Sequence, residues 1–381
     1  MKTIKFNEPF IAGNELDYIK DVFELKHFSG NGKYTRKCRD FISSRLKVEE
    51  VLLTDSCTSA LEISALLLKE EKYQEVILPS YTFSSTAAAF ARAGFKLIFA
   101  EINPGNMMLD LNDVKSKITA NTCAVVAVHY GGYCAEINKL RTLCNERQIF
   151  LIEDGAQAFD CFLEGKALGT FGQLGCISFH ETKNIHAGLA GALLINDHKF
   201  SKRATYIWER GTNRQEVMKG LVDKYSWVEI GGSFYPSELQ AAFLYAQLEA
   251  LDRNFQERKV VYDTYRASLI ELRNRCQLGF PDFPTDYKPN YHAFFVIFNS
   301  EPECDAVREF LKKQQVMAYI GYVPLHSSIV GKKMGYHEND LPLTEEYARR
   351  VLRLPFHNDL SVQDVDYIGA LIKACLEGKS I

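Results

Sequence analysis

The amino-acid sequence predicts an α/β fold, with a mostly parallel sheet that helices cover on both faces and a smaller C-terminal α/β domain. Three observations lead to this prediction. Short apolar runs alternate with helical patterns between about residues 50 and 200. A long helical stretch follows from Ser237. The chain has 381 residues, more than one ordinary hydrophobic core accommodates.

The apolar runs predict the strands. They are short, rich in Val, Ile, Leu and Phe, and mostly apolar throughout, which is typical of strands buried on both faces. The expected strands are Val51–Thr54, Glu75–Leu78, Lys96–Ala100, Ala124–His129, Phe150–Glu153, Gly175–Phe179 and Ala192–Ile195.

Helical patterns lie between these runs, for example at Thr58–Leu68, Ser85–Ala93 and Asn138–Arg147. Strands that alternate with helices indicate a mostly parallel sheet.

The second half of the chain predicts a smaller domain. The helical stretch that begins with SELQAAFLYAQLEAL is expected to link the two domains, and a strand at Ala293–Phe298 and a helix near Val362–Leu376 follow it. We therefore expect a large domain at residues 1–250, including the N-terminal segment, and a small C-terminal domain at residues 251–381.

The composition excludes several classes of protein. The net charge of −3 and the pI near 6.3 give no overall basic field, so we expect neither nucleic acid nor a membrane as a partner. The first residues have no apolar core of a signal peptide, and no apolar run approaches a membrane span. The ten cysteines form no C-x-x-C pair, which argues against a zinc ribbon and fits a reducing, cytoplasmic compartment.

Polar side chains follow three of the expected strands, where an open α/β sheet binds its ligands. The first group is in LLTDSCTSALE, where the residues from Ser56 to Ser59 open a helix. Free N–H groups and the dipole at a helix N-terminus form an anion site. Ser and Thr are also the usual N-caps, so this pattern alone leaves both interpretations open.

The second group follows the strand FLIED. Glu153 and Asp154 end this strand, and Gln157 lies three residues further. A carboxylate here suits a protonated ring nitrogen, such as that of pyridoxal 5′-phosphate (PLP). The alternative is that Asp154 caps the next helix.

The third group is GCISFHETKN, in which a strand leads into a polar loop that contains Lys183. A lysine that binds a cofactor covalently must be within reach of it and desolvated enough to react. The alternative is an ordinary solvated lysine.

The order of the three groups resembles that of the fold type I PLP-dependent transferases: an anion site, an acid about 100 residues later and a lysine about 30 residues beyond it. More narrowly, the chain resembles the sugar-nucleotide aminotransferases that act on deoxysugars. The similarity covers nearly the whole chain, in FNEPFIAGNELDYI, LPSYTFSSTAAAF, VHYGG, IEDGAQAF, GCISFHETKN, SELQAAFLYAQLE, YVPLH and LRLPFHNDLS.

The resemblance implies PLP as the cofactor and assigns roles to the matching residues. Lys183 would bind PLP covalently and carry a proton between the cofactor and the sugar. Asp154 would pair with the pyridinium nitrogen, Phe83 would stack on the ring, and Gln157 would contact the side of the ring that bears the hydroxyl group.

The resemblance also implies a phosphate site. Cys57 and Thr58, largely through backbone N–H groups, and Ser178 would hold the phosphate. Ser233 stands where many relatives carry an Asn that reaches the phosphate from the neighbouring subunit, and we expect Ser233 to take this place.

Two further departures from the family pattern stand out. Many relatives have Gly at the position of Cys57, where a backbone contact survives the change. Most have a Gly-Glu-Gly-Gly-like run after the lysine, whereas here KNIHAGLAGALL has no acid and one residue fewer, which alters the loop at residues 187–192. We expect His129, His180, His292 and His326 to be packed or capping residues, and we expect no metal.

As a function, the resemblance implies transamination of dTDP-4-keto-6-deoxy-D-glucose at C4 by a homodimer. L-Glutamate is the expected donor and dTDP-4-amino-4,6-dideoxy-D-galactose the expected product, in deoxysugar biosynthesis of the kind that supplies lipopolysaccharide O-antigen. One alternative is the gluco C4 epimer. Another is a sugar dehydratase of the same fold, against which Lys183 argues because those relatives carry His there. The third is a non-catalytic regulatory descendant, which only the altered loop favours.

Overall fold

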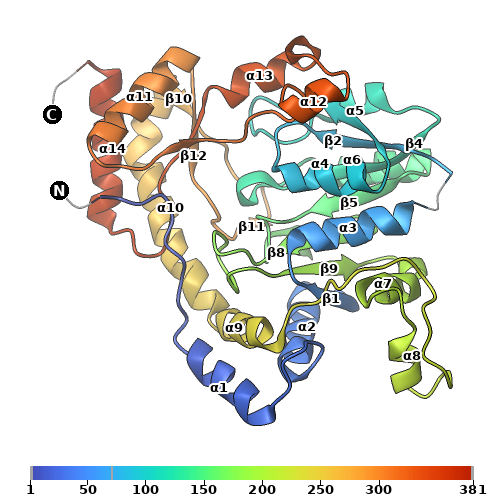
Figure 1. Cartoon of the computed structure of the whole chain (residues 1–381). Coiled ribbons are helices and arrows are strands. Elements are labelled where there is room, and N and C mark those ends of the chain that lie inside the picture. The colour runs from blue at the N-terminus through green and yellow to red at the C-terminus, as the bar shows by residue number, and fades with distance from the viewer. Residues whose placement is uncertain (1–2, 70–71, 379–381) are drawn as a thin grey trace.

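The computed structural model describes residues 3–69 and 72–378, and its largest element is a seven-stranded sheet (Figure 1). All seven strands expected from the sequence are present, with ends within two residues of the expected ones. In sheet order they are β1 (Glu50–Thr54), β9 (Gly191–Ile195), β8 (Leu174–Ser178), β5 (Phe150–Asp154), β4 (Thr122–Val128), β2 (Glu75–Pro79) and β3 (Lys96–Ala100).

The large sheet is mostly parallel, as expected. Strands β3, β2, β4, β5 and β8 run in one direction, and only β9 is antiparallel to both of its neighbours, β8 and β1. Strand β1 therefore runs in the same direction as β8. The segments that follow β1, β2, β4, β5 and β8 consequently meet at one edge of the sheet.

Helices cover both faces of this sheet, because both sets of alternating strand residues are apolar. Leu52 and Leu193 enter a core beneath one set of helices, whereas Leu53 and Leu194 enter a core on the other face. The first set is α3 (Cys57–Leu68), α4 (Ser84–Arg92) and α7 (Ser201–Trp208). The second set is α2 (Lys33–Leu46), α5 (Leu111–Lys117), α6 (Ile137–Arg147) and α9 (Glu238–Glu249).

Helix α9 is the start of the stretch SELQAAFLYAQLE, and it packs against both α2 and α1 (Glu15–Leu25). These two contacts account for its apolar residues on more than one face. Its buried Glu238 accepts the backbone N–H groups of Gly32 and Tyr34, each at 2.8 Å, at the start of α2. A carboxylate at a helix N-terminus complements the helix dipole.

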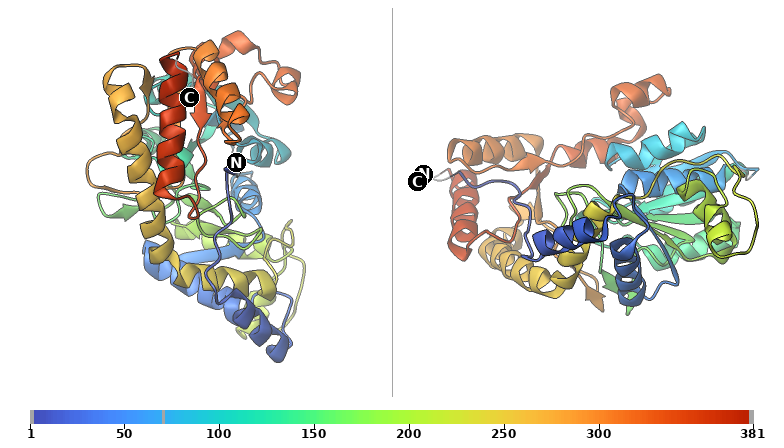
Figure 2. Two further views of the ribbon diagram at one scale, coloured as in Figure 1. Left: turned by 90° about the vertical axis from the view of Figure 1, so that its left-hand side faces the viewer. Right: turned by 60° about the horizontal axis from the view of Figure 1, so that its bottom comes forward.

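The C-terminal part forms a four-stranded antiparallel sheet with helices beside it. Its strands, in sheet order, are β10 (Leu278–Gly279), β12 (Phe295–Phe298), β14 (Val351–Arg353) and β13 (Tyr319–Ile320). Its helices include α10 (Leu251–Asn274), α11 (Glu301–Lys313) and α14 (Val362–Leu376), which lie together at one end of the molecule in both views of Figure 2. The strand and the final helix that the sequence predicts in this region are both present.

The N-terminal segment runs along this second sheet. Ile4 pairs with Val316, and the N–H of Phe356 donates to the carbonyl of Phe6 at 3.0 Å. The N-terminal residues, which the sequence analysis assigned to the large domain, thus contact the C-terminal part. The predicted domain boundary near residue 250 therefore remains a proposal.

Short elements complete the described residues. They are β6 (Phe162–Leu163), β7 (Lys166–Ala167), β11 (Tyr287–Lys288), α8 (Arg214–Met218), α12 (Ile329–Lys333), α13 (Pro342–Ala348), η1 (Tyr130–Gly132), η2 (His198–Phe200) and η3 (Glu338–Asp340). Across residues 3–69 and 72–378, no helix combines the length and apolar character needed to cross a lipid bilayer.

Candidate active site

The segments beyond the carboxyl ends of the parallel strands line one cavity of about 320 Å³. Segments of the C-terminal part close it from the other side. Seven of the eight site residues expected from the sequence line this cavity: Cys57, Thr58, Phe83, Asp154, Gln157, Ser178 and Lys183.

Lys183 lies in the turn after β8, where its backbone N–H donates to the carbonyl of His180 at 2.8 Å. Burial lowers the pKa of Lys183 to about 8, and the charge of Arg353 acts in the same direction, against Cys57 and Asp154. The interpretation as a solvated surface lysine is therefore wrong. An amine with this pKa is partly neutral near pH 7, as a nucleophile must be.

Asp154 ends β5 and faces the cavity. One carboxylate oxygen accepts the hydroxyl hydrogen of Thr86 at 2.7 Å, and the other accepts the N–H of Ala156 at 3.1 Å. No helix begins within residues 155–161, all of which the structure describes, so Asp154 is not a helix cap. Its position leaves it available to pair with a cationic group in the cavity.

The neighbouring Glu153 has a structural role. Because successive strand residues point to opposite faces, its side chain is buried away from the cavity. It lies 3.0 Å from Nε2 of His129, and it accepts three backbone N–H groups, from Gly169, Phe171 and Gly172, at 2.6–2.8 Å. Glu153 thus fixes the segment between β7 and β8.

The start of α3 forms one end of the cavity. The Ser56 hydroxyl caps the helix by accepting the N–H of Ser59 at 3.1 Å. The first intrahelical bond is donated by Ala60, so the N–H groups of Cys57 and Thr58 precede the helical ladder. Both interpretations of this segment therefore hold: Ser56 is the cap, and the two residues after it present donors suited to an anion.

Gly191 allows β9 to pass close to this helix start. A Cβ atom at position 191 would lie 2.5 Å from the backbone nitrogen of Cys57, closer than carbon and nitrogen atoms approach. The glycine near the end of the altered loop therefore lets β9 approach the start of α3 at this end of the cavity.

Hydroxyl groups surround this end. The Thr58 hydroxyl donates to Ser85 at 2.8 Å, and the Ser178 hydroxyl accepts the N–H of His180 at 3.4 Å. Hydroxyl and backbone N–H groups together suit a phosphate.

Phe83 and Gln157 lie farther along the cavity. Phe83 is 58% exposed, so its ring face is accessible, and its centroid lies 6.1 Å from that of Tyr322. Gln157 accepts the N–H of Gly131 at 2.6 Å and donates to the Tyr322 hydroxyl at 2.9 Å. These two contacts fix the amide of Gln157 at the cavity.

Ser233 is exposed and does not line the cavity of its own chain. Its role at the phosphate of a neighbouring subunit remains a prediction. The altered loop is ordered by the bonds from Glu181 N–H to Gly188 carbonyl (2.8 Å) and from the Gln240 side chain to Leu189 carbonyl (2.8 Å), and it places Leu189 at the cavity.

Thr86, Tyr322 and Arg353 are among the cavity residues that were not singled out from the sequence. Tyr322 and Arg353 belong to the segments YVPLH and LRLPF, which carry part of the family resemblance. The sequence therefore pointed to these segments but assigned no role to either residue. Thr86 follows Phe83 by one helical turn, which places it beside the end of β5.

The four histidines have protein partners. His129 contacts Glu153, His180 contacts Thr182 (3.0 Å), His292 contacts Asn184 (2.8 Å) and His326 contacts Ser80 (2.7 Å). Within the described parts of the chain, no group of three or more His, Cys, Asp or Glu side chains is arranged to hold a metal ion.

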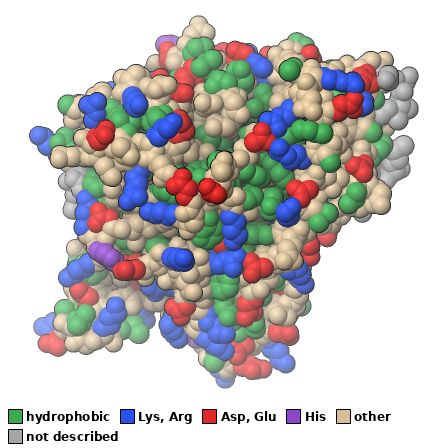
Figure 3. Space-filling view, turned by 180° about the vertical axis from the view of Figure 1, so that it is seen from behind, with side chains coloured by type: hydrophobic (Ala, Val, Ile, Leu, Met, Phe, Trp, Pro, Cys, Tyr) green, Lys and Arg blue, Asp and Glu red, His purple; other side chains and the backbone are tan. Residues whose placement is uncertain are grey.

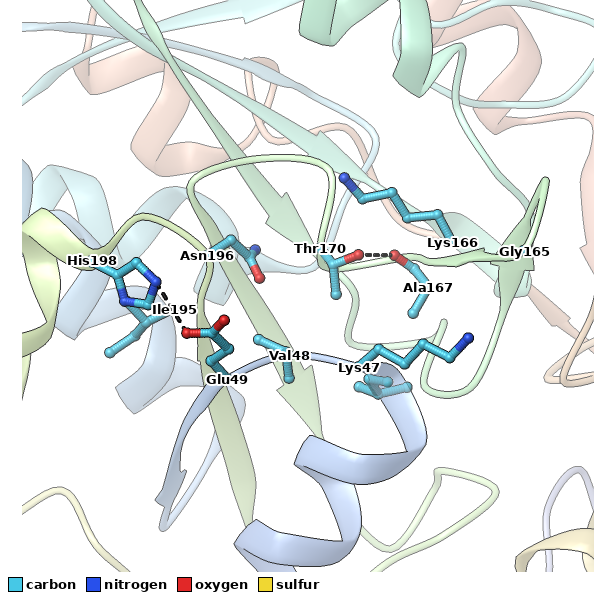
Figure 4. A pocket seen from close by; sticks show the side chains of 11 residues that line it. Lys47, Val48, Glu49, Gly165, Lys166, Ala167, Thr170, Ile195, Asn196 and His198 are labelled. Atoms are coloured by element: carbon cyan, nitrogen blue, oxygen red, sulfur yellow. Dashed lines mark hydrogen bonds and ion pairs between the residues drawn. The ribbon is translucent and has the colours of Figure 1, made fainter.

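A second cavity of about 310 Å³ lies at the opposite edge of the sheet, beside the start of β1 (Figure 4). It contains a His198–Glu49 pair at 3.1 Å, whose side chains are 71% and 82% exposed, and Thr170 bonded to a backbone carbonyl. The residues of this second cavity include no buried reactive group.

Acidic and basic side chains are intermixed on the face of the molecule shown in Figure 3.

The residues of the first cavity fit PLP. Donors at the start of α3 match the phosphate, the carboxylate of Asp154 matches a protonated ring nitrogen, and the partly neutral Lys183 matches the aldehyde. The close approach that Gly191 permits holds the phosphate end in place.

Comparison with known proteins agrees with this fit. Residues 9–373 match the DegT/DnrJ/EryC1/StrS aminotransferase family. The chain is 27% identical over 372 residues to GDP-perosamine synthase of Vibrio cholerae, covering 96% of this chain and 97% of that protein. It is 28% identical over 371 residues to dTDP-4-dehydro-2,3,6-trideoxy-D-glucose 4-aminotransferase of Saccharopolyspora spinosa, covering 95% and 94% of the two chains. The solved aminotransferase TlmJ from Streptoalloteichus hindustanus superimposes with a TM-score of 0.89 at 27% identity, covering 99% of this chain and 100% of that one.

Proposed function

The chain belongs to the DegT/DnrJ/EryC1/StrS aminotransferase family and is a PLP-dependent sugar-nucleotide aminotransferase, and within this family we propose that it aminates dTDP-4-keto-6-deoxy-D-glucose at C4. L-Glutamate is the proposed donor, and dTDP-4-amino-4,6-dideoxy-D-galactose is the proposed product. The observation that carries the proposal is the convergence of Lys183, Asp154 and the start of α3 on one cavity.

Each of these groups has a defined task. PLP, when bound, supplies the electron sink that stabilises negative charge on the substrate carbon. Asp154, held by Thr86 and Ala156, keeps a negative charge beside the ring nitrogen and favours its protonated form. Lys183, whose pKa burial lowers to about 8 in the PLP-free chain, would hold the cofactor, and its amine would carry the proton at the substrate carbon.

The acceptor is inferred from sequence similarity. The segments HETKN, ERGTNR and VDKYSW resemble those of enzymes that aminate dTDP-linked 4-keto sugars to galacto products. One relative is named as a 4-aminotransferase of a dTDP-linked deoxysugar and another as a synthase of a GDP-linked sugar, so the nucleotide is the feature most in need of a test.

We also propose a homodimer with shared active sites. Apolar side chains from α8 to residue 230 are strongly exposed: Met218, Leu221, Tyr225, Trp227 and Ile230 are 60–75% accessible. Burial of such a cluster against a second copy removes apolar surface from water. A second copy bound there is also what would bring Ser233 to a neighbouring phosphate site. Sedimentation of an active monomer at assay concentration would refute the dimer.

We also propose that the protein is cytoplasmic. All ten cysteines are free thiols, and most are buried, which is consistent with a reducing environment.

The function is tested by incubating the PLP-loaded enzyme with L-glutamate and dTDP-4-keto-6-deoxy-D-glucose, with the GDP-linked keto sugar as the matched control. Product NMR identifies the position and configuration of the amine. A small H3–H4 coupling indicates an axial C4 amine and supports the galacto product, whereas a large coupling indicates the gluco epimer. Absence of PLP binding and of turnover would instead support a regulatory descendant.

A further inference from the structure

Arg353 is a partly buried arginine that lines the active-site cavity and has no hydrogen-bond or ion-pair partner among the described residues. It ends β14, where its backbone pairs with Phe295 of β12 and Tyr319 of β13, and its side chain lines the cavity together with Lys183. Its Nε atom is buried and makes no hydrogen bond. Across residues 3–69 and 72–378, no hydrogen bond or ion pair involves its guanidinium group.

Arg258 shows what a structural arginine looks like in this fold. It is buried, and its Nε donates to the Tyr291 carbonyl at 2.9 Å and its Nη2 to the His292 carbonyl at 2.6 Å. A third contact joins it to Asn358 at 3.2 Å. Arg258 is therefore satisfied by the protein itself, whereas Arg353 is not.

The surroundings of Arg353 leave its donors free. Its Cζ atom lies 5.1 Å from the ring centroid of Phe6 and 6.0 Å from that of Tyr322, so aromatic faces offset part of the cost of burial. Rings accept no strong hydrogen bonds, and a buried guanidinium with unused donors is costly. Such a group in a ligand cavity indicates a site for an anion.

Asp154 is not this anion. No ion pair joins its carboxylate to Arg353 in the described parts of the chain, and its oxygens accept hydrogen bonds from Thr86 and Ala156 instead. The hydroxyl groups near Arg353 belong to Tyr81, Tyr130 and Tyr322; burial raises the pKa of each, to about 12 for Tyr322, and keeps them neutral. The negative charge must therefore come from a ligand.

We infer that Arg353 binds the α-carboxylate of the amino-acid donor. This inference rests on the proposed function, because it concerns the donor of that reaction. In an amino acid the carboxylate is attached to the same carbon as the reacting amine, so its anchor must lie close to Lys183. Arg353 meets this requirement because it and Lys183 line the same cavity, and its charge contributes to lowering the pKa of Lys183. The planar guanidinium offers two parallel N–H donors to a carboxylate.

The diphosphate of the sugar nucleotide fits this position less well. In a hexose the diphosphate at C1 lies across the ring from C4, so it is held well away from the carbon that receives the amine. A cofactor phosphate fits less well too, because the donors at the start of α3 serve it.

The experiment compares the Arg353→Met enzyme with wild type in the donor half-reaction alone. PLP-loaded enzyme is mixed with one amine in the absence of sugar, and the cofactor absorbance reports conversion to the amine form. Three amines distinguish binding of the α-carboxylate from binding of the distal carboxylate. L-Glutamate has both groups, L-norvaline has only the α-carboxylate, and 4-aminobutyrate has only the distal carboxylate. Arg349→Met is the matched control, since Arg349 is exposed and pairs with Glu345 at 3.3 Å.

We expect Arg353→Met to slow L-glutamate and L-norvaline by roughly 10²-fold, because truncating one partner of a buried charge pair has an effect of this order. The rate with 4-aminobutyrate should change by less than about threefold, and Arg353→Lys should restore part of the loss. Calorimetric binding of 2-methyl-L-glutamate, which has no hydrogen on its α-carbon, should weaken by a similar factor. Arg349→Met should behave as wild type throughout.

Three results would overturn the inference. One is an equal loss with L-glutamate and 4-aminobutyrate, which would assign Arg353 to the distal carboxylate. Another is an unchanged donor half-reaction with a raised KM for the sugar nucleotide, which would assign it to the diphosphate. The third needs no variant: wild type that converts 4-aminobutyrate as fast as L-glutamate has no α-carboxylate anchor. A wild-type enzyme that completes the donor half-reaction but aminates no dTDP-linked sugar refutes the proposed acceptor and leaves the role of Arg353 standing.

Discussion

Replacement of Lys183 by Met in the PLP-free protein should stabilise the fold in a pH-dependent manner. Burial lowers the pKa of Lys183 from 10.5 to about 8, so the folded state binds its proton less tightly than the unfolded chain does. When the lysine is charged in both states, this difference costs about 3 kcal/mol of folding free energy. Methionine removes the charge and keeps a side chain of similar length.

The pH window follows from the two pKa values. Below about pH 8 the full cost is present. Between pH 8 and 10.5 the unfolded chain binds more protons than the folded one, so wild-type stability rises with pH and approaches that of the variant. At pH 9.5 the remaining cost is roughly 1.5 kcal/mol, so the difference in unfolding free energy between variant and wild type should fall by about 2 kcal/mol from pH 7.

Urea unfolding of both PLP-free proteins at the two pH values measures this change, and packing effects of the methionine cancel because they do not depend on pH. Lys312→Met is the matched control, since it makes the same substitution at an exposed position on α11. A Lys183→Met difference that stays constant between pH 7 and 9.5 would show that Lys183 is not held in a desolvated site, and the reasoning above would fail.

Three further predictions concern the cofactor site. Borohydride reduction of the PLP-loaded enzyme should place the pyridoxyl label on Lys183, as peptide mapping can verify, and Lys183→Ala should have no measurable turnover. Asp154→Asn should lower kcat by about 10²-fold or more while PLP still binds, because the neutral amide no longer favours the protonated ring; near-normal turnover would contradict this role. Gly191→Ala should weaken PLP affinity about tenfold or more in equilibrium titrations, since the added Cβ pushes β9 away from Cys57; unchanged affinity would contradict the close-packing argument.

Much of the fold follows from patterns that are local in the sequence. The seven strands of the large sheet were predictable within two residues, because strands buried on both faces are apolar throughout and are separated by helical patterns. Helices α1 and α2 were not expected. They depend on contacts with α9, more than 200 residues later, among them the bonds from Gly32 and Tyr34 to Glu238.

The features of the candidate site can likewise be separated into those that the sequence predicts and those that depend on tertiary contacts. The sequence by itself placed a helix start, an acid and a lysine directly after predicted strands, since strand ends are local features. Although the family resemblance assigned the role to Asp154, the residue pattern alone did not decide between Glu153 and Asp154. The tertiary structure did, because the alternation of side chains along β5 turns Asp154 to the cavity and Glu153 to three backbone N–H groups.

Only the tertiary structure brought Arg353 to Lys183. The two residues are 170 positions apart, on different sheets, and no periodicity of the chain relates them. Their meeting depends on how the C-terminal sheet packs against the carboxyl edge of the large one. Burial at that junction lowers the pKa of Lys183 and leaves the Nε of Arg353 without a hydrogen bond in the described parts of the chain. Desolvation is a property of the assembled cavity rather than of either segment.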